Sequence, residues 1–438
     1  MNAVYSKITW RLLPLLVVIY LFAYIDRTVV GFAKLQMSVD IGLSDAAFGF
    51  GAGVFFIGYA LCEIPSNLIL TRVGPRRWFA RIMISWGIVT VAMALTNSEL
   101  TFYILRFLLG VAEAGFYPGI LYLITRWYPS TRRARIVGLF LLANPIALAI
   151  GGPISATILD GMDGVAGIAG WQWLFIIVGI PPVLLAFVVL KTLPDTPADA
   201  KWLTPAEVAR VQSDLEVSDV RTGAVKLHRP LRVLLDGRVW LLAMFFIAYS
   251  LIGYGLGLWL PQIISNMGVG TIATGWLSTL PWLAATVALV VIPRNAERTK
   301  TPYLHMWVTL GLAAVGFTFS AVLAQPALQM VFLCVAAFGI FAGQPIFWSL
   351  PSQVLTGAAA AAGLAMINTL GATGGFLGPF GVGYISQVTG DPRNGLFFLV
   401  AVAVYAMIML IFVRIMMKRH RARYGTPEPE HTDAEVRS

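Results

Sequence analysis

Apolar runs of about 20 or more residues recur along this chain of 438 residues and dominate its organisation. A helix needs about 20 such residues to cross a bilayer. Only 12% of the residues are charged, against about 25% in soluble domains. We therefore predict an all-α membrane protein with twelve transmembrane helices, roughly at 12–34, 46–70, 78–97, 101–125, 135–159, 171–190, 239–265, 271–293, 302–323, 327–350, 357–387 and 394–415.

Basic residues gather in alternate connections between these spans. They cluster before the first span and after spans 2, 4, 8 and 12, whereas the other connections hold chiefly Lys34 and Arg393. Lys and Arg flanking a span favour the cytoplasmic side. We therefore expect a multi-pass protein of the cell (inner) membrane with both termini cytoplasmic. The net charge of +10 is explained by this topology, so nucleic acid is not an expected partner.

Landmarks in the two halves of the chain repeat at nearly the same offset. Gly152-Pro153 matches Gly378-Pro379 and Pro118 matches Pro345, 226 and 227 residues apart. This indicates two pseudo-symmetric six-helix halves, and transporters built in this way bind substrate near the midplane between the halves. The expected division is 1–190 for the first half, 191–238 for a cytoplasmic central loop, 239–416 for the second half and 417–438 for a cytoplasmic tail.

The central loop contains one helix-start signal. Thr204 precedes Pro205 and stands three residues before Glu207, as in a capping box, which predicts a short amphipathic helix to about Leu215. We expect residues 231–240 to lie along the inner membrane face, and the polar residues after 424 to be disordered.

Ionisable residues lie deep in the spans of the first half only. They are Asp26 and Arg27 in span 1, Glu63 in span 2, and Arg106 and Glu113 in span 4. Charges at this depth are costly and normally face a cavity or a partner. Arg106 and Glu113 lie seven residues apart, hence on one helix face about 10.5 Å apart in rise. They could pair with each other only by reaching along the helix, and each could instead pair across helices. The role is either a structural ion pair that packs span 4 against span 1, or a carboxyl that carries a proton.

Arg27 is a candidate anion receptor. It either neutralises Asp26 or holds a separate partner, and adjacent helical residues point about 100° apart, which favours a separate partner such as a substrate carboxylate. Glu63 is expected to pair with a loop arginine in a structural or gating role, with proton transfer as the alternative. Tyr59, one turn deeper, is a candidate cavity-lining residue.

The second half offers neutral candidates instead of charges. Trp348, close after Pro345, is a candidate for stacking on a ligand, and Asn368 is a candidate amide contact. Cys62 and Cys334 lie in apolar runs and are interpreted as apolar packing residues. Nothing in the sequence indicates enzymatic chemistry, a cofactor or a metal site.

Together these motifs resemble the major facilitator superfamily and, within it, the anion:cation symporter family. The resemblance covers nearly the whole chain. It is carried by Tyr24-Ile-Asp26-Arg27, Phe55-Phe-Ile-Gly-Tyr59, Glu63-Ile-Pro-Ser-Asn67, Arg106 with Glu113-Ala-Gly-Phe-Tyr-Pro-Gly119, Gly151-Gly-Pro-Ile-Ser155, Leu193-Pro-Asp195 and Ala198-Asp-Ala-Lys-Trp-Leu203.

The resemblance implies proton-driven uptake of an organic anion by alternating access. It assigns proton coupling to Asp26 and Glu113 with Arg106, and gating to Glu63, Arg72 and Arg76. Positions around the bound anion are matched by Tyr24, Arg27, Tyr59, Asn144, Trp348 and Asn368.

Two departures from the family pattern bear on mechanism. Thr71 stands where the superfamily has an acid before Arg72, so the inner latch is weaker or uses Glu63. Pro345 and Phe347 replace the small polar residues of members that move sugar acids. This favours a less hydroxylated anion, such as a tartrate-like dicarboxylate, phthalate or hydroxyphenylacetate.

The sequence thus predicts a monomeric, proton-coupled symporter in the lipid bilayer that imports a small aromatic or dicarboxylic anion. An exchanger or efflux pump of the same fold is the main alternative. A transport-inactive sensor and a membrane enzyme are further alternatives with less support.

Overall fold

The computed structural model is helical throughout the residues it describes, which are 3–141, 143–222, 236–351 and 357–424. The α-helices are α1 (Ala3–Asp40), α2 (Asp45–Val73), α3 (Pro75–Ala92), α4 (Glu99–Glu113), α5 (Phe116–Trp127), α6 (Ser130–Leu141), α7 (Ala143–Gly161), α8 (Gly170–Thr192), α9 (Pro205–Thr222), α10 (Gly237–Ser265), α11 (Thr271–Thr299), α12 (Pro302–Val322), α13 (Pro326–Ala342), α14 (Gln344–Trp348), α16 (Gly357–Thr389) and α17 (Asn394–Tyr424). Single 3₁₀ turns occur at Met93–Leu95, Val165–Gly167 and Pro197–Asp199.

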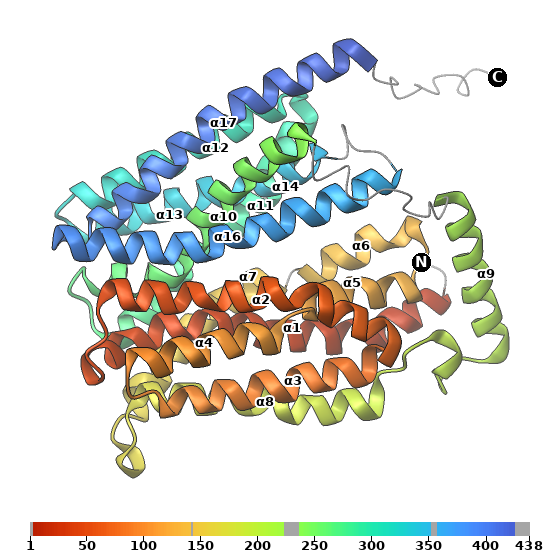
Figure 1. The fold of residues 1–438 in the computed structure, drawn as a ribbon, viewed down its shortest axis with the longest axis horizontal. Coiled ribbons are helices and arrows are strands. Elements are labelled where there is room, and N and C mark those ends of the chain that lie inside the picture. The colour runs from red at the N-terminus through yellow and green to blue at the C-terminus, as the bar shows by residue number, and fades with distance from the viewer. Residues whose placement is uncertain (1–2, 142, 223–235, 352–356, 425–438) are drawn as a thin grey trace.

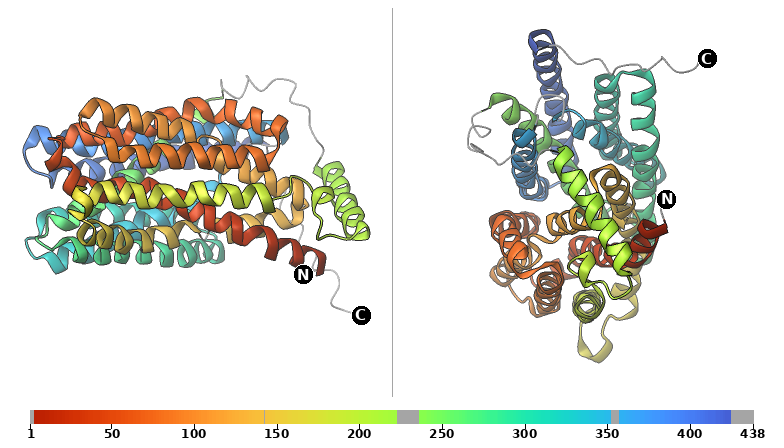
Figure 2. Two further views of the ribbon diagram at one scale, coloured as in Figure 1. Left: turned by 90° about the horizontal axis from the view of Figure 1, so that it is seen from below. Right: turned by 90° about the vertical axis from the view of Figure 1, so that its right-hand side faces the viewer.

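The long helices form two bundles that lie side by side. Figure 1 shows α1–α8 as the lower bundle and α10–α17 as the upper one, and the end-on view in Figure 2 shows the bundles stacked on each other. We call these the first and second halves. Eleven helical segments in the described chain are long and apolar enough to cross a membrane, and the 33-residue α16 has the length of a further span. This architecture confirms the predicted fold of twelve spans in two halves.

Two of the predicted continuous spans are broken in the structure. The fourth span, predicted over 101–125, consists of α4 and α5, and the tenth, predicted over 327–350, consists of α13 and α14. Gly115, between α4 and α5, has a φ of 85°, a conformation that favours glycine. Pro118 and Pro345, which the internal repeat matches to each other, each lie close after one of these breaks. The breaks themselves were not predicted.

The central-loop helix α9 begins where the sequence predicts but runs beyond the expected end near Leu215, to Thr222. Thr204 and Glu207 form the predicted capping box, because the Thr204 backbone N–H donates to Glu207 Oε2 at 2.8 Å and the Glu207 N–H donates to Thr204 Oγ1 at 3.3 Å. Lys7 of α1 adds an ion pair to Glu207 at 2.9 Å. These hydrogen bonds, first that of Thr204 and then that of Lys7, lower the pKa of the Glu207 carboxyl.

The segment predicted over 231–240 differs from its expected form. Residues 231–235 lie outside the described part of the chain, and α10 already begins at Gly237, so Trp240 belongs to a long helix of the second half. The tail after 424 lies outside the described residues.

The two halves pack closely at one end of the molecule. We call this the far end, because it lies opposite α9 in Figure 1; it includes the turns 41–44 and 390–393. Glycines allow the close approach, since a Cβ on Gly31 of α1 would collide with the backbone of Leu258 in α10, and one on Gly49 of α2 with Pro379 in α16. Helix pairs α2–α16 and α7–α11 form most of this seam between the halves.

A glycine contact within the first half gives a test of this packing. A Cβ on Gly110 of α4 would overlap the carbonyl oxygen of Phe55 in α2, whereas one on Gly138 of α6 would meet nothing within 4 Å. We expect Gly110→Ala to lower the apparent Tm of the detergent-purified protein, at a cost of about 1–3 kcal/mol from overpacking. Gly138→Ala is the matched control and should leave Tm unchanged or raise it slightly, because alanine is the better helix former. Equal Tm values for the two variants would contradict the packing described.

Candidate functional site

The break in the fourth span places Glu113 at the last residue of α4, inside the first half. Ala114 leaves the helical conformation and Gly115 takes the left-handed one. Ser66 of α2 donates to the Ala114 carbonyl oxygen at 2.6 Å, and Trp78 of α3 donates its Nε1–H to Ser66 Oγ at 3.0 Å. A non-helical backbone inside a membrane protein is stable only when its polar groups find such partners.

Arg27 of α1 is the ion-pair partner of Glu113. Arg27 Nε donates to Glu113 Oε2 at 2.8 Å, and the two side chains are 15% and 1% exposed. The pair joins the first span to the end of α4. Glu113 Oε1 is buried and has no hydrogen-bond partner among the described residues. The carboxyl therefore has one oxygen in the ion pair and one oxygen that can take a proton.

Aromatic rings surround the Arg27 guanidinium. Its Cζ lies 5.7 Å from the ring centroid of Tyr24, 5.5 Å from that of Phe55 and 5.1 Å from that of Tyr59, all within cation–π range. Arg27 Nε donates to Glu113, and the hydroxyls of Tyr59 and Tyr254 also interact with the guanidinium. The terminal N–H groups of a guanidinium match the geometry of a carboxylate.

Asp26 and Arg106 are buried close to this pair. Thr90 of α3 donates to Asp26 Oδ1 at 2.7 Å, while Asp26 Oδ2 is buried without a described hydrogen-bond partner. Arg106 Nη2 donates to the Ala52 carbonyl oxygen at 3.2 Å, and its Cζ lies 4.9 Å from the centroid of Phe55. The charge of Arg106 acts on both Asp26 and Glu113.

The first half therefore encloses a cluster of two acids and two guanidiniums, which we call the buried tetrad: Asp26, Arg27, Arg106 and Glu113. Asp26, Arg106 and Glu113 are at most 2% exposed. The four formal charges cancel when all groups are ionised. In a medium of low effective dielectric constant, any added anion disturbs this balance unless a proton accompanies it.

The pairing inside the tetrad is one of the two arrangements that the sequence left open. No ion pair within 4.0 Å joins Arg106 and Glu113 in the described structure, and Glu113 pairs across helices with Arg27 of the first span. Arg27 has a partner other than Asp26, as the helix geometry favours. That partner is Glu113, a carboxylate of the protein itself.

The neutral candidates lie on other helices and none is hydrogen-bonded to the tetrad among the described residues. Asn144 lies near the start of α7 and is partly buried, whereas Asn368 of α16 is exposed. Trp348 ends α14 and packs edge-on against Phe246, with ring centroids 4.7 Å apart.

The residues assigned to gating make a different contact from the one expected. Among the described residues Glu63 forms no ion pair with Arg72 or Arg76. Asp195, which follows α8, accepts a hydrogen bond from the Arg76 backbone N–H at 2.7 Å, and Arg76 Nε lies 3.9 Å from Asp195 Oδ2. Asp195 therefore contacts the start of α3, close to the end of α2, where Thr71 replaces the family's acid.

Three contacts were not anticipated from the sequence. Thr90 anchors Asp26, and Phe55 lies between both guanidiniums. Tyr254 of α10 packs against Phe56 of α2, with centroids 4.4 Å apart, and its hydroxyl interacts electrostatically with Arg27. Tyr254 thus brings the second half to the site. The sequence signals for this region were the Phe55–Tyr59 motif and the position of Tyr254 within the seventh predicted span.

Comparison with known proteins identifies the family. The model of the Major Facilitator Superfamily matches residues 16–379. A quinolone resistance transporter of Acinetobacter baumannii is 45% identical over 96% of this chain and 97% of its own length. A proposed tartrate transporter of Agrobacterium vitis is 42% identical over 96% of this chain and 93% of its own length.

A solved transporter structure has the same fold. A bacterial homologue of the human lysosomal transporter Spinster, in an inward-facing and unoccupied conformation, superposes with a TM-score of 0.79 at 19% identity, covering 98% of this chain and all of that one. These relatives are transporters, and none of them is an enzyme. The chain therefore belongs to the Major Facilitator Superfamily and is a multi-pass membrane transporter.

Proposed function

We propose that the protein is a proton-coupled symporter that imports a small organic anion, a dicarboxylate or an aromatic carboxylate, by alternating access. The observation that carries this proposal is the pair between Arg27 and Glu113. Arg27 donates its Nε–H to Glu113, and Glu113 Oε1 is buried without a hydrogen-bond donor among the described residues. In this proposal a substrate carboxylate binds the terminal nitrogens of Arg27 in place of the Tyr59 and Tyr254 hydroxyls, and Glu113 Oε1 takes a proton.

Charge balance gives the reason for coupling. A substrate anion on Arg27 competes with Glu113 for the same guanidinium and adds negative charge to the neutral tetrad. A proton on Glu113 restores neutrality and leaves Arg27 for the anion. Because uncompensated buried charge is strongly unfavourable, the anion and the proton bind together more readily than either binds alone.

The remaining residues receive supporting roles in this proposal. Asp26 is the second proton carrier and Arg106 stabilises the ionised forms of both acids. Tyr24 and Tyr59 shape the carboxylate site. Asn144, Trp348 and Asn368 contact the rest of the anion from the other helices, as the family resemblance implies.

Membrane placement follows from the distribution of basic residues. In this proposal the α9 end and both termini are cytoplasmic, in a bacterial inner membrane, and the far end faces outward. A monomer is sufficient for transport, because each chain contains both halves. Glu63, Arg72 and Arg76, with Asp195, belong to the inner gate.

An efflux pump or exchanger is a second candidate. The quinolone resistance transporter, at 45% identity, supports it, since quinolone antibiotics carry a carboxylate on an aromatic ring and present the same group to Arg27. The proposed tartrate transporter supports import of a dicarboxylate. In the symporter and in the efflux pump or exchanger alike, Arg27 would bind a carboxylate. The two functions differ in the direction in which the proton gradient drives the anion.

Proteoliposomes with an imposed pH gradient distinguish the two candidates. We expect L-tartrate, phthalate or 4-hydroxyphenylacetate to accumulate when the lumen is alkaline relative to the medium, because protons then move inward with the anion. The diamide of tartaric acid is the matched control ligand and should not accumulate. Accumulation only with an acidic lumen would favour the exchanger. If no carboxylate accumulates and none accelerates proton influx, the symporter proposal fails.

Replacement of Arg27 by lysine tests the carboxylate receptor. Lysine keeps the positive charge beside Glu113 but replaces a two-pronged donor by a point charge. We expect the KM for the transported anion to rise about tenfold, the loss of roughly one charge-assisted hydrogen bond. Arg298→Lys, at an exposed site on α11, is the control and should leave KM unchanged. A KM within twofold of wild type for Arg27→Lys would assign Arg27 a structural role only.

A further inference from the structure

Lys34 is a buried lysine on the far-end side of α1. From the sequence, its position at the connection between two spans suggested an exposed loop residue. Its side chain is only 4% exposed. Burial of an ammonium group is costly unless charged and polar partners replace its water. The partners of Lys34 therefore indicate what the burial achieves.

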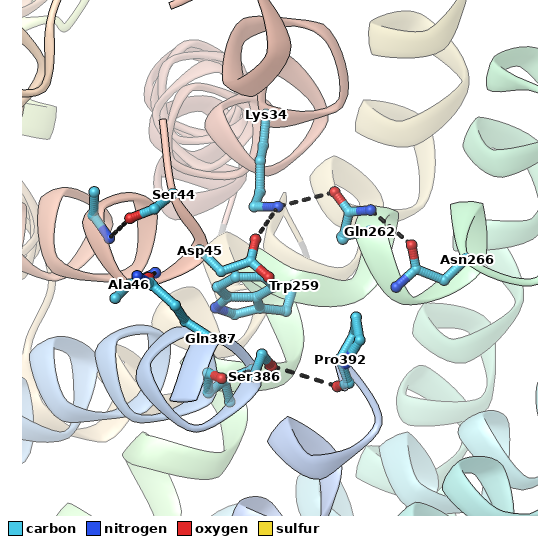
Figure 3. Close-up of polar contacts among 12 residues, drawn as sticks. Lys34, Ser44, Asp45, Ala46, Trp259, Gln262, Asn266, Ser386, Gln387 and Pro392 are labelled. Carbon is cyan, nitrogen blue, oxygen red and sulfur yellow. Dashed lines mark hydrogen bonds and ion pairs between the residues drawn. The ribbon is translucent and has the colours of Figure 1, made fainter. Parts of the chain in front are cut away.

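Four side chains from both halves enclose the Lys34 ammonium. Within α2, Asp45 Oδ1 lies 2.8 Å from Nζ, and the Phe48 ring centroid lies 5.5 Å away. Within α10, Gln262 Oε1 accepts a hydrogen bond from Nζ at 3.0 Å, and the Trp259 centroid lies at 4.7 Å. Figure 3 shows Lys34 between Asp45 and Gln262 with the Trp259 ring beside them.

The two halves contribute unequal partners. The carboxylate belongs to the same half as Lys34, whereas the second half offers only an amide oxygen and an aromatic face. If the halves separate at the far end, Lys34 keeps its ion pair with Asp45 and loses the contacts to Gln262 and Trp259. The charge is thus balanced in both arrangements, and the closed arrangement gains a charge-assisted hydrogen bond and a cation–π contact.

Both partners in the second half are held in position. Gln262 Nε2 donates to Asn266 Oδ1 at 2.8 Å, which directs the other end of the amide, Oε1, toward Lys34. Trp259 donates its Nε1–H to the Pro379 carbonyl oxygen at 3.0 Å, which fixes the ring against α16. Beside them, the Ala46 N–H donates to Gln387 Oε1 at 2.9 Å, so α2 and α16 also meet here.

We propose that Lys34 is the latch of the far-end gate: its ammonium binds Gln262 and Trp259 of the second half when this end is closed, and releases them when it opens. The strength of the Gln262 contact then sets the ratio of open to closed molecules. This inference requires only that the halves move relative to each other, and it is independent of the transported anion and of proton coupling.

Two substitutions of Gln262 should change the ratio of open to closed molecules in opposite directions. Gln262→Leu removes the acceptor but leaves the Lys34–Asp45 pair intact, and should raise the open-to-closed ratio about tenfold, as expected for a hydrogen bond to a charged group. Gln262→Glu replaces the amide oxygen by a carboxylate, and should lower the ratio by about the same factor.

Spin labels across the seam measure this ratio directly. Cysteines replace Val39 of α1 and Val388 of α16, which are 81% and 66% exposed, in a chain whose native Cys62 and Cys334 are changed to serine. Pulsed EPR then gives the distance distribution in lipid nanodiscs without anion or pH gradient. A short-distance population should shrink in Gln262→Leu and grow in Gln262→Glu.

The controls use an exposed glutamine away from the seam. Gln212 of α9 receives the same two substitutions, and both should leave the distance distribution unchanged. The proposal is overturned if neither Gln262 variant shifts the distribution, if both shift it in the same direction, or if the Gln212 variants shift it equally. Because no transport is measured, a failure here leaves the symporter proposal to its own test.

Discussion

The ion pair between Arg27 and Glu113 is the interaction on which the rest of the site depends. It lies inside the first half, where two acids and two guanidiniums balance each other away from water. Each member would be expensive to bury alone. The remaining contacts of the tetrad hold its members in place: Thr90 anchors Asp26, and the Ala52 carbonyl oxygen anchors Arg106.

The backbone is shaped to make this pair possible. Glu113 reaches Arg27 because α4 ends there, and Gly115 and Ser66 stabilise the break. Backbone packing also positions a buried cation at the far end, where close glycine contacts bring the halves together and Lys34 is buried between them. One cation of α1, Arg27, is therefore paired with Glu113 inside the first half, and another, Lys34, lies at the far-end side of α1 in a contact between the halves.

The fold was predictable because hydrophobic length, basic-residue distribution and repeated landmarks all indicate it. The identities of the tetrad residues were predictable too, since each is a charge deep in an apolar run. The pairing of the tetrad residues was not predictable, because it depends on the helix break after Glu113. A Gly or Pro in a span does not by itself show whether the helix bends or breaks. The partners Thr90 and Gln262 were unpredictable for another reason: polar residues of this kind are common in spans, and only tertiary packing selects them.

The central claim is that Glu113 carries the proton whose binding releases Arg27 for the anion. The most direct measurement compares two assays in the same proteoliposomes for Glu113→Gln: exchange of labelled for unlabelled anion, and accumulation driven by a pH gradient. We expect exchange to persist, because the neutral amide leaves Arg27 available. We expect gradient-driven accumulation to be lost, because the amide cannot take a proton. Accumulation at the wild-type level in Glu113→Gln would contradict this claim.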